Sequence, residues 1–228
     1  MSDDVRLILG DCLDVLRTLE AGSVDAVVTD PPYGVAMGIG KDMRGGKHGL
    51  AKRHYVGCGD TYEDFVSQVV PRLNACLDVA SRAAVFTGPH MQEQRKASAL
   101  GGVYCPAGAG RHPWGFKTFL PVLFYGTAPD LHKGARHNVL RSTVRAEKNG
   151  HPCPKPLEWM TWLIGLTTRP GETVLDPFMG SGTTGVACVR TGRRFVGVEI
   201  SPEYYQIAER RIAAEKAKLP LFPQADPA

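Results

Sequence analysis

The stretch Val24-Asp25-Ala26-Val27-Val28-Thr29-Asp30-Pro31-Pro32-Tyr33 is the starting point for interpreting the whole chain. Its first half is an apolar run rich in β-branched residues, which is typical of a strand buried within a parallel sheet. The two prolines end that strand, because proline lacks a backbone N–H and has a fixed φ. Asp30 therefore stands at the carboxyl end of a predicted buried strand, where open α/β sheets bind their ligands.

The residues after this strand form a set suited to a planar base that carries an exocyclic amino group. The carboxylate of Asp30 and the carbonyl of Pro31 can accept both amino hydrogens, while the ring of Tyr33 stacks on the base. An isolated Asp-Pro-Pro more often marks only a proline-rich turn. The apolar strand before it and the Tyr33-Gly34 pair after it favour the catalytic interpretation.

Composition limits the class of protein. With 228 residues, of which 43% are hydrophobic and 22% charged, residues 1–228 are expected to form one globular domain. No long apolar run predicts a membrane helix, and the acidic N-terminus lacks the features of a secretory signal, so we expect a cytoplasmic protein. Six scattered cysteines without a CxxC pair argue against a zinc site, and we expect no metal. The net charge of +4 is compatible with nucleic-acid binding.

Apolar periodicity and turn residues predict alternating strands and helices along the chain. The predicted strands cover 5–9, 24–28, 83–86, 118–125, 173–176 and 195–199. The predicted helices cover 13–19, 61–77, 91–100, 157–166, 183–192 and 201–212. Thr61 and Asp64 resemble a capping box at the start of the second helix, which Pro71 should kink or divide.

Two basic segments interrupt this pattern. Residues 34–60 are glycine-rich and cannot bury enough apolar surface to fold alone, so they predict a mobile loop. Residues 101–147 are also largely irregular and basic. A charge run is usually just a solvated face, but basic and aromatic residues interleaved in two segments suit a nucleic-acid surface. The candidate DNA-binding residues are Lys41, Arg44, Lys47, Lys52, Arg53, Arg111, Lys133, Arg136 and Arg141.

A second motif lies late in the chain. Gly180-Ser181-Gly182-Thr183-Thr184-Gly185 matches G-x-G-x-x-G between a predicted strand and a predicted helix, which alone is a weak signal. Glu199 ends the next predicted strand, where it can accept hydrogen bonds from ribose hydroxyls. A tight turn would explain the glycines but not the acid, so the pair indicates an adenosine-containing cofactor. A nicotinamide dinucleotide enzyme would continue through more βα units, whereas S-adenosylmethionine needs no pyrophosphate cradle.

Taken together, the motifs resemble those of the amino-methylating DNA methyltransferases of the permuted β group, which act on adenine N6 or cytosine N4. The matching pieces are Gly10-Asp11-Cys12, Asp30-Pro31-Pro32-Tyr33, His151-Pro152 with Lys155-Pro156, Asp176-Pro177-Phe178-Met179-Gly180-Ser181-Gly182, and Val198-Glu199. The resemblance implies an α/β, Rossmann-like S-adenosylmethionine-dependent methyltransferase fold. It implies a mostly parallel sheet with helices on both faces and a circularly permuted motif order.

The resemblance also implies roles by position. It places Glu199 at the cofactor's ribose, Asp11 with Cys12 at the adenine edge, and Lys155 at the carboxylate end. The implied cofactor-binding residues are Asp11, Cys12, Asp30, Lys155, Asp176, Phe178, Gly180, Ser181, Gly182, Thr183 and Glu199. The implied catalytic residues are Asp30, Pro31, Pro32 and Tyr33.

The implied activity is site-specific methyl transfer from S-adenosylmethionine to the N6 amino group of a flipped adenine in DNA, as in restriction-modification systems. Asp rather than Ser before Pro-Pro-Tyr favours adenine N6 over cytosine N4. Residues 101–147 are the candidate target-recognition insertion. A cytosine-N4 enzyme, an RNA methyltransferase, a catalytically inactive nucleic-acid binder and, on the glycine motif alone, a nicotinamide oxidoreductase are the alternatives. The residues leave open whether the chain forms a homodimer.

Overall fold

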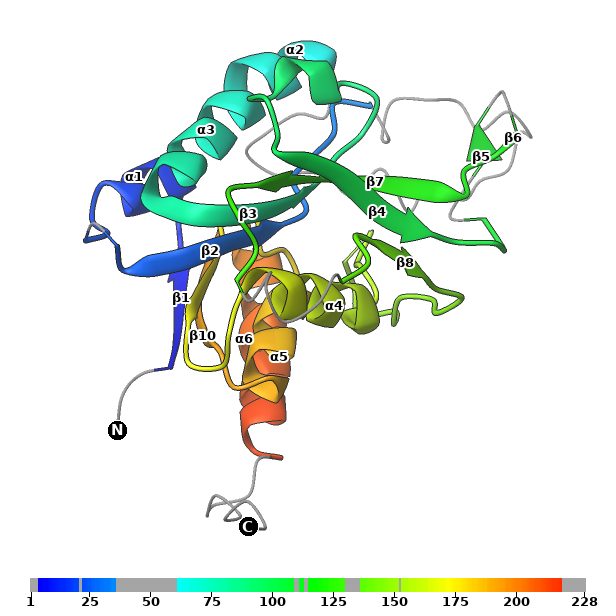
Figure 1. Cartoon of the computed structure of the whole chain (residues 1–228). Helices are drawn as coiled ribbons and strands as arrows, with labels where there is room; N and C mark the ends of the chain where they lie inside the picture. Colours follow the sequence, from blue (N-terminus) through cyan, green and yellow to red (C-terminus); the bar gives the residue numbers. More distant parts are fainter. Residues whose placement is uncertain are drawn as a thin grey trace.

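An eight-stranded sheet forms the centre of the computed structural model, which describes residues 4–20, 22–35, 61–108, 111–112, 115–129, 136–151 and 153–218 (Figure 1). The strand order is β1-β10-β9-β2-β3-β7-β4-β8. The strands are β1 (Val5–Leu9), β2 (Val24–Thr29), β3 (Ala80–Phe86), β4 (Ala99–Tyr104), β7 (Phe119–Tyr125), β8 (Val139–Arg141), β9 (Thr173–Asp176) and β10 (Arg194–Glu199). A separate hairpin pairs β5 (Arg111–His112) with β6 (Gly115–Phe116).

The direction of the strands determines where a ligand site can form. β1, β10, β9, β2 and β3 run parallel to one another, so their carboxyl ends meet at one edge of the sheet. β7 runs antiparallel to β3 and β4, so its amino-terminal end lies at that same edge. This edge therefore gathers the polar turns that follow the parallel strands and the segment that enters β7.

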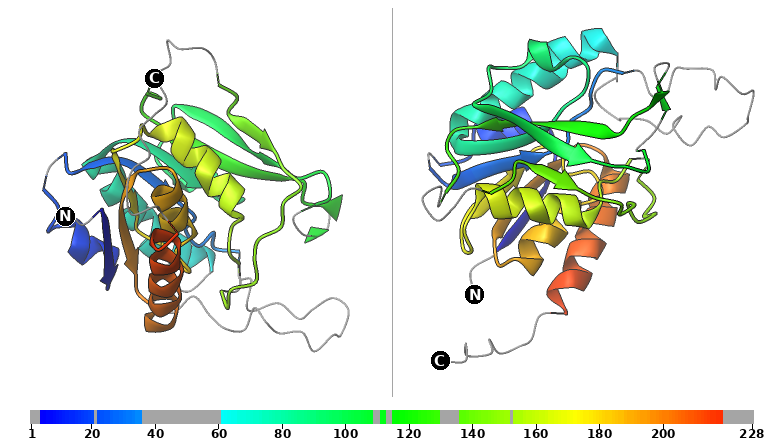
Figure 2. Two further views of the ribbon diagram at one scale, coloured as in Figure 1. Left: turned by 90° about the horizontal axis from the view of Figure 1, so that it is seen from below. Right: turned by 45° about the vertical axis from the view of Figure 1, so that its right-hand side comes forward.

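Helices cover both faces of the sheet, as the right-hand view of Figure 2 shows. The elements are α1 (Cys12–Leu16), α2 (Tyr62–Asp64), α3 (Val70–Val79), α4 (Leu157–Thr167), α5 (Thr183–Arg190) and α6 (Pro202–Lys216). One buried core joins α4, α5 and α6 to the sheet, and the other joins α1 and α3 to its opposite face. Within the described ranges, no helix has the length and apolar character needed to cross a bilayer. The predicted α/β fold is confirmed.

Local signals account for several element boundaries. The capping box of Thr61 and Asp64 is present, and Ser201 caps α6 as the sequence predicts. Pro71 lies in the first turn of α3, where its missing N–H does no harm, and a π-helical turn (Phe65–Val69) precedes that helix. The predicted helix is thus divided just before Pro71, and a regular helix continues through Pro71 itself.

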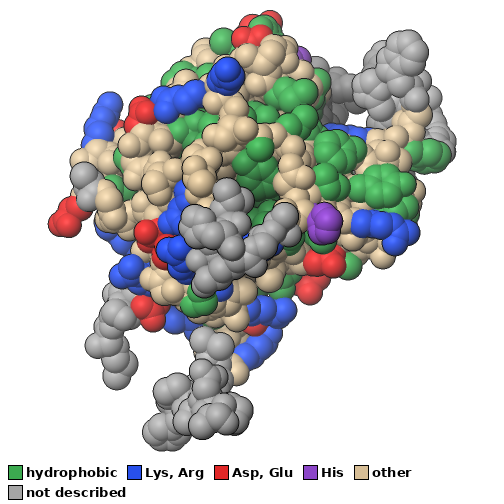
Figure 3. Space-filling view, viewed as in Figure 1, with side chains coloured by type: hydrophobic (Ala, Val, Ile, Leu, Met, Phe, Trp, Pro, Cys, Tyr) green, Lys and Arg blue, Asp and Glu red, His purple; other side chains and the backbone are tan. Residues whose placement is uncertain are grey.

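The predicted helix over 91–100 is wrong. The structure has a short 3₁₀ turn, Met91–Glu93, and then β4, which pairs with β7 along its whole length. Glycine at position 101 permits a close backbone approach within this strand, because a Cβ there would lie 2.0 Å from the carbonyl oxygen of Asn138. Residues 101–147 include β7, β8 and most of β4, which are all strands of the main sheet. Figure 3 shows apolar side chains over this end of the sheet, and Leu100, Tyr104 and Phe119 are among the exposed ones.

Candidate active site

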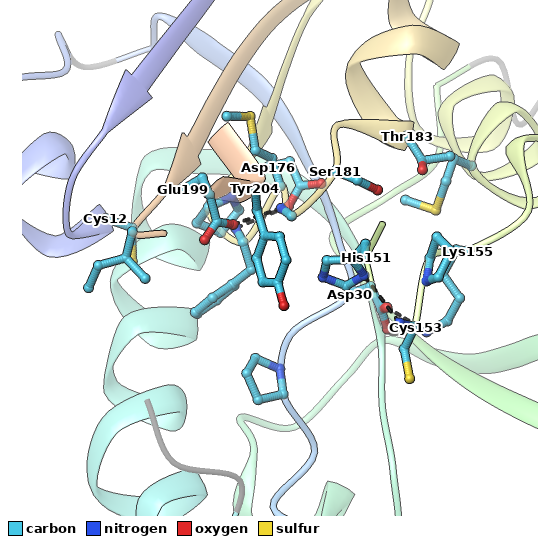
Figure 4. A pocket seen from close by; sticks show the side chains of 18 of the residues that line it. Cys12, Asp30, His151, Cys153, Lys155, Asp176, Ser181, Thr183, Glu199 and Tyr204 are labelled. Atoms are coloured by element: carbon cyan, nitrogen blue, oxygen red, sulfur yellow. Dashed lines mark hydrogen bonds and ion pairs between the residues drawn. The ribbon is translucent and has the colours of Figure 1, made fainter. Parts of the chain in front are cut away.

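A cleft opens at the edge of the sheet where β1, β2, β9 and β10 end. It spans about 900 Å³ of space that is continuous with solvent. Its walls come from the turns after these strands and from the segment before α4, including His151 and Lys155. In Figure 4, Glu199 lies on one side of the cleft and Asp30 and Lys155 on the other, with the rings of Tyr204 and His151 between them.

The glycine turn between β9 and α5 depends on the absence of side chains. Gly180 and Gly182 have φ of +52° and +77°, a region that other residues rarely adopt. A Cβ on Gly182 would lie 2.8 Å from the Cβ of Ala208 on α6, so the turn packs closely on that helix. A Cβ on Gly180 would lie 3.1 Å from Nε2 of His151. The turn therefore forms a tight floor for one end of the cleft.

Glu199 braces this turn and faces the cleft. Its carboxylate accepts hydrogen bonds from the backbone N–H groups of Gly180 and Ser201, both at 2.8 Å. Burial raises the pKa of Glu199 above its usual value, and the backbone hydrogen bonds oppose that effect. A carboxylate has about four acceptor positions, so two hydrogen bonds leave capacity for ligand hydroxyls.

Asp176 borders the cleft but is almost completely buried. It accepts hydrogen bonds from the hydroxyl of Thr29 at 2.6 Å, the hydroxyl of Thr184 at 2.5 Å and the N–H of Phe178 at 3.1 Å. Burial raises the pKa of Asp176 to about 6, and the hydrogen bonds lower it less. Its contacts join β9 to β2 and to α5, which gives it a structural part in the site.

Asp11 lies in the wall of the cleft and has a partner that the sequence did not predict. It caps α1 by accepting from the N–H of Leu13 at 2.9 Å, and it forms an ion pair with Arg72 of α3 at 2.5 Å. The Arg72 hydrogen bond holds the pKa of Asp11 below its usual value. Cys12, next to it, is buried and lines the cleft. Arg72 sits in a helix whose pattern gives no sign of a site.

Asp30 is held from two directions at the end of β2. The hydroxyl of Tyr33 donates to one carboxylate oxygen, and the ammonium group of Lys155 contacts the other. The Lys155 nitrogen also lies 5.4 Å from the ring centroid of Tyr33 and 5.3 Å from that of Phe86. The carboxylate keeps free lone pairs beside these contacts, so it can still accept from an amino group.

A second lysine lies beside the same aromatic ring. The ammonium group of Lys117 is 5.8 Å from the ring centroid of Tyr33. Burial, and then the positive charge of Lys155, lower the pKa of Lys117. Two cations and one carboxylate therefore surround Tyr33.

The segment before α4 and the helix α6 support the glycine turn. His151 packs edge-on against Tyr204, with ring centroids 4.7 Å apart, and burial lowers its pKa to about 4. Arg211 of α6 donates to the carbonyl of Ser181 at 2.5 Å and to the hydroxyl of Thr183 at 3.3 Å. His151 stands within a motif visible in the sequence. Tyr204 and Arg211 had only helical periodicity as a signal.

The structure brings most of the predicted cofactor residues to one cleft. Those that line it are Asp11, Cys12, Asp30, Lys155, Asp176, Phe178, Gly180, Ser181, Thr183 and Glu199. Gly182 packs beneath the turn against α6 instead. Pro32 lines the cleft and Pro31 is buried next to it. Residues that line it without having been predicted include Arg72, Cys153, Met160, Ile200 and Tyr204.

The candidate DNA-binding residues differ in where they lie relative to the described structure. Lys41, Arg44, Lys47, Lys52, Arg53 and Lys133 lie outside the described residues, as does the basic segment beyond Val35. Arg111 belongs to β5, and Arg141 is exposed on β8. Arg136 donates to the carbonyl oxygens of Gly165, near the end of α4, and of Pro129. Part of the Arg136 side chain is thus used within the fold. In the described part of the chain, no group of three His, Cys, Asp or Glu residues is placed to hold a metal.

Comparison with known proteins gives a family match. Residues 114–210 match the family model described as DNA methylase, of the N6/N4 type. This segment contains β7, α4, the glycine turn and β10. It does not contain Asp30, which the structure places in the lining of the cleft, or Tyr33, whose hydroxyl donates to Asp30.

Three proteins show how far the likeness extends. The type II methyltransferase M.HpaI of Haemophilus parainfluenzae is 24% identical over 93% of this chain and 75% of its own length. The crystal structure of the M1.HpyAVI–SAM complex has a TM-score of 0.62 at 21% identity and covers 91% of this chain and 98% of that one. The cytosine-N4-specific PvuII DNA methyltransferase has a TM-score of 0.64 at 17% identity, over 95% of this chain and 94% of that one.

Proposed function

We propose that the chain is a DNA methylase of the N6/N4 type and that it transfers a methyl group from S-adenosylmethionine to the N6 amino group of adenine in DNA. The observation that carries the proposal is the position of Asp30. Its carboxylate stands at the wall of the cleft, next to Tyr33 and Pro31, and on the side opposite Glu199. A cofactor on Glu199 and a base on Tyr33 would therefore meet at Asp30.

The residues of the cleft suit S-adenosylmethionine. Glu199 offers acceptor positions for ribose hydroxyls, and apolar or aromatic side chains such as Phe178 and Tyr204 offer surface for the adenine and the aliphatic part. The glycine turn places Gly180 and Ser181 in the lining of the cleft. When bound, this cofactor supplies an electrophilic methyl group.

Three groups of the chain would handle the base. Asp30 and the Pro31 carbonyl accept the amino hydrogens, which directs the nitrogen lone pair out of the ring. They also stabilise the positive charge that develops on that nitrogen, so they act mainly on the transition state. Tyr33 stacks on the base, which contributes about 1–3 kcal/mol against the cost of extrusion from the duplex. Its hydroxyl, now on Asp30, holds the carboxylate until the amino group arrives.

Adenine N6 is the finer part of the proposal. Asp before Pro-Pro-Tyr favours it as a tendency of the family, and both adenine and cytosine present an amino donor to Asp30. The fold is shared with a cytosine-N4-specific enzyme, so cytosine N4 is the second candidate. Residues 101–147 and the basic segment 34–60 are proposed to contact the DNA, the former for target recognition.

Labelled methyl transfer tests the proposal directly. The protein is incubated with S-adenosylmethionine that carries a labelled methyl group and with unmethylated DNA, and the digested nucleosides are separated. Labelled N6-methyladenine is the expected product. Labelled N4-methylcytosine would keep the role of Asp30 and change the base. Cofactor binding without label in any DNA would overturn the activity, and an RNA substrate or a catalytically inactive fold would then be preferred.

A further inference from the structure

We propose that Lys117 binds a backbone phosphate next to the target nucleotide, an inference that rests on the proposed function. Lys117 stands between β6 and the start of β7. Because β7 is antiparallel to β3, its first residues lie at the edge where the parallel strands end. The position brings the Lys117 ammonium to within 5.8 Å of the ring centroid of Tyr33, on which the base is proposed to stack.

Lys117 is a half-buried cation without a carboxylate of its own. Among the residues that the structure describes, none forms an ion pair with it. Asp30 is the acid whose charge acts on it, but the carboxylate of Asp30 forms its ion pair with Lys155 and accepts from Tyr33. A cation that is partly removed from water is stabilised when an anion reaches it. The surroundings of Lys117 therefore favour an anionic ligand.

The chemistry of the substrate identifies the anion. A target base is neutral, and the cofactor's carboxylate belongs to the cleft, whose lining does not include Lys117. An extruded nucleotide turns about its own backbone, so its flanking phosphates stay at the mouth of the base pocket. Among the anions of the substrate, a phosphodiester next to the target base is thus the nearest to an ammonium group beside Tyr33.

A double-mutant cycle tests this inference by combining a substitution of Lys117 with DNA in which one phosphate has lost its charge. The methylated position is first mapped with the wild-type protein, and duplexes are then made with a methylphosphonate in place of either phosphate that flanks the target base. At one of these two positions the wild type should lose about tenfold in affinity. Lys117→Gln should lose about tenfold on unmodified DNA and nothing further on the neutral duplex.

Salt dependence and a distant lysine provide the controls. Lys117→Gln removes one phosphate contact, so the magnitude of the slope of log affinity against log salt concentration should fall by about 0.9. Lys216→Gln, in the exposed last turn of α6, should keep the slope and the sensitivity of the wild type. Lys117→Met, which keeps the apolar length of the side chain, serves as a second variant if the first does not fold.

The outcomes separate this inference from the proposed function. The wild type can methylate DNA while the affinity loss from Lys117→Gln and the loss from the methylphosphonate simply add at both flanking positions. That result would overturn the phosphate contact and leave the proposed function standing. A wild-type protein that binds its cofactor but transfers no methyl group to DNA would overturn the proposed function and this inference with it.

Discussion

The ammonium group of Lys155 contacts the carboxylate of Asp30, although 125 positions separate the two residues in the chain. Their side chains are 12% and 23% exposed, so the pair is partly shielded from water. The motif resemblance places Lys155 at the carboxylate end of the cofactor, whereas its contact here is with the proposed catalytic acid. Removing Lys155 should therefore affect catalysis and cofactor binding to different extents.

Lys155→Met should lower the rate of methyl transfer at least tenfold and change the cofactor's dissociation constant less than threefold. The reason is that Lys155 holds Asp30, and hydrogen bonds to charged groups contribute roughly 1.5–3 kcal/mol. Single-turnover rates and calorimetric titration with the cofactor measure the two effects. Lys155→Arg, which keeps the positive charge, should recover part of the rate. A large loss of cofactor affinity with an unchanged rate would instead support the role implied by the motif.

Asp30→Ala should abolish measurable transfer, a loss of at least about 10² to 10³-fold, because the charge that develops on the amino nitrogen would lose its main acceptor. Cofactor binding should persist, since Glu199 and the glycine turn are separate from Asp30. Asp78→Ala is a matched control, because Asp78 is an exposed acid that forms an ion pair with Arg95 on the surface. An active Asp30→Ala protein would rule out the proposed mechanism.

The sequence predicts those parts of the fold that local chemistry determines. The strand ending at Asp30 is continuous in apolar residues and is stopped by two prolines, so its position follows from its own composition. The turn that contains Gly182 is equally local, because only glycine adopts its backbone there without strain. β4 is different. Its strand state comes from pairing with β7, which lies about twenty residues later in the chain, so periodicity over 91–100 could not indicate it.

The same distinction applies to the site. Predicted residues line the cleft because acids and glycines at strand ends are brought to one edge by any parallel sheet. Arg72 and Tyr204 were missed because they project from helices with ordinary apolar patterns. The pairing of Lys155 with Asp30 also could not be predicted, since it depends on how far a flexible side chain reaches between distant segments.

The pH dependence of stability should reveal two buried groups with opposite effects. The pKa of His151 falls from 6.5 to about 4, so the unfolded chain binds more protons between these values and His151 favours folding increasingly as pH rises to 6.5. The pKa of Asp176 rises from 3.8 to about 6, so Asp176 favours folding less as pH rises through that range. The two effects oppose each other between pH 4 and 6 in the wild type.

Asp176→Asn should uncover this opposition. Relative to the wild type, its free energy of unfolding should increase between pH 4 and 6 by up to about 3 kcal/mol and stay constant above. His151→Gln should show the reverse trend, losing stability relative to the wild type as pH rises to 6.5. Denaturant titrations at fixed pH values measure both differences. Differences that do not vary with pH would contradict the assigned protonation states.

Gly182→Ala and Gly192→Ala form a matched pair that tests the packing of the glycine turn. Both residues have positive φ, +77° and +67°, so alanine carries about 1–2 kcal/mol of backbone strain at either position. A Cβ at Gly192 meets no atom within 4 Å, whereas one at Gly182 would lie 2.8 Å from the Cβ of Ala208. Overpacking adds about 1–3 kcal/mol, so Gly182→Ala should reduce the free energy of unfolding by roughly 3 kcal/mol and Gly192→Ala by about 1.

Cofactor affinity extends the same comparison. Displacing the glycine turn from α6 would move the backbone N–H of Gly180, which donates a hydrogen bond to Glu199. Gly182→Ala should therefore also bind the cofactor at least about tenfold more weakly. Gly192→Ala, remote from the cleft lining, should bind it like the wild type. Denaturant unfolding and cofactor titration on the two purified variants provide both measurements. Equal losses of stability in the two variants would show that backbone strain alone accounts for the need for glycine at position 182. Contact with α6 would then play no part.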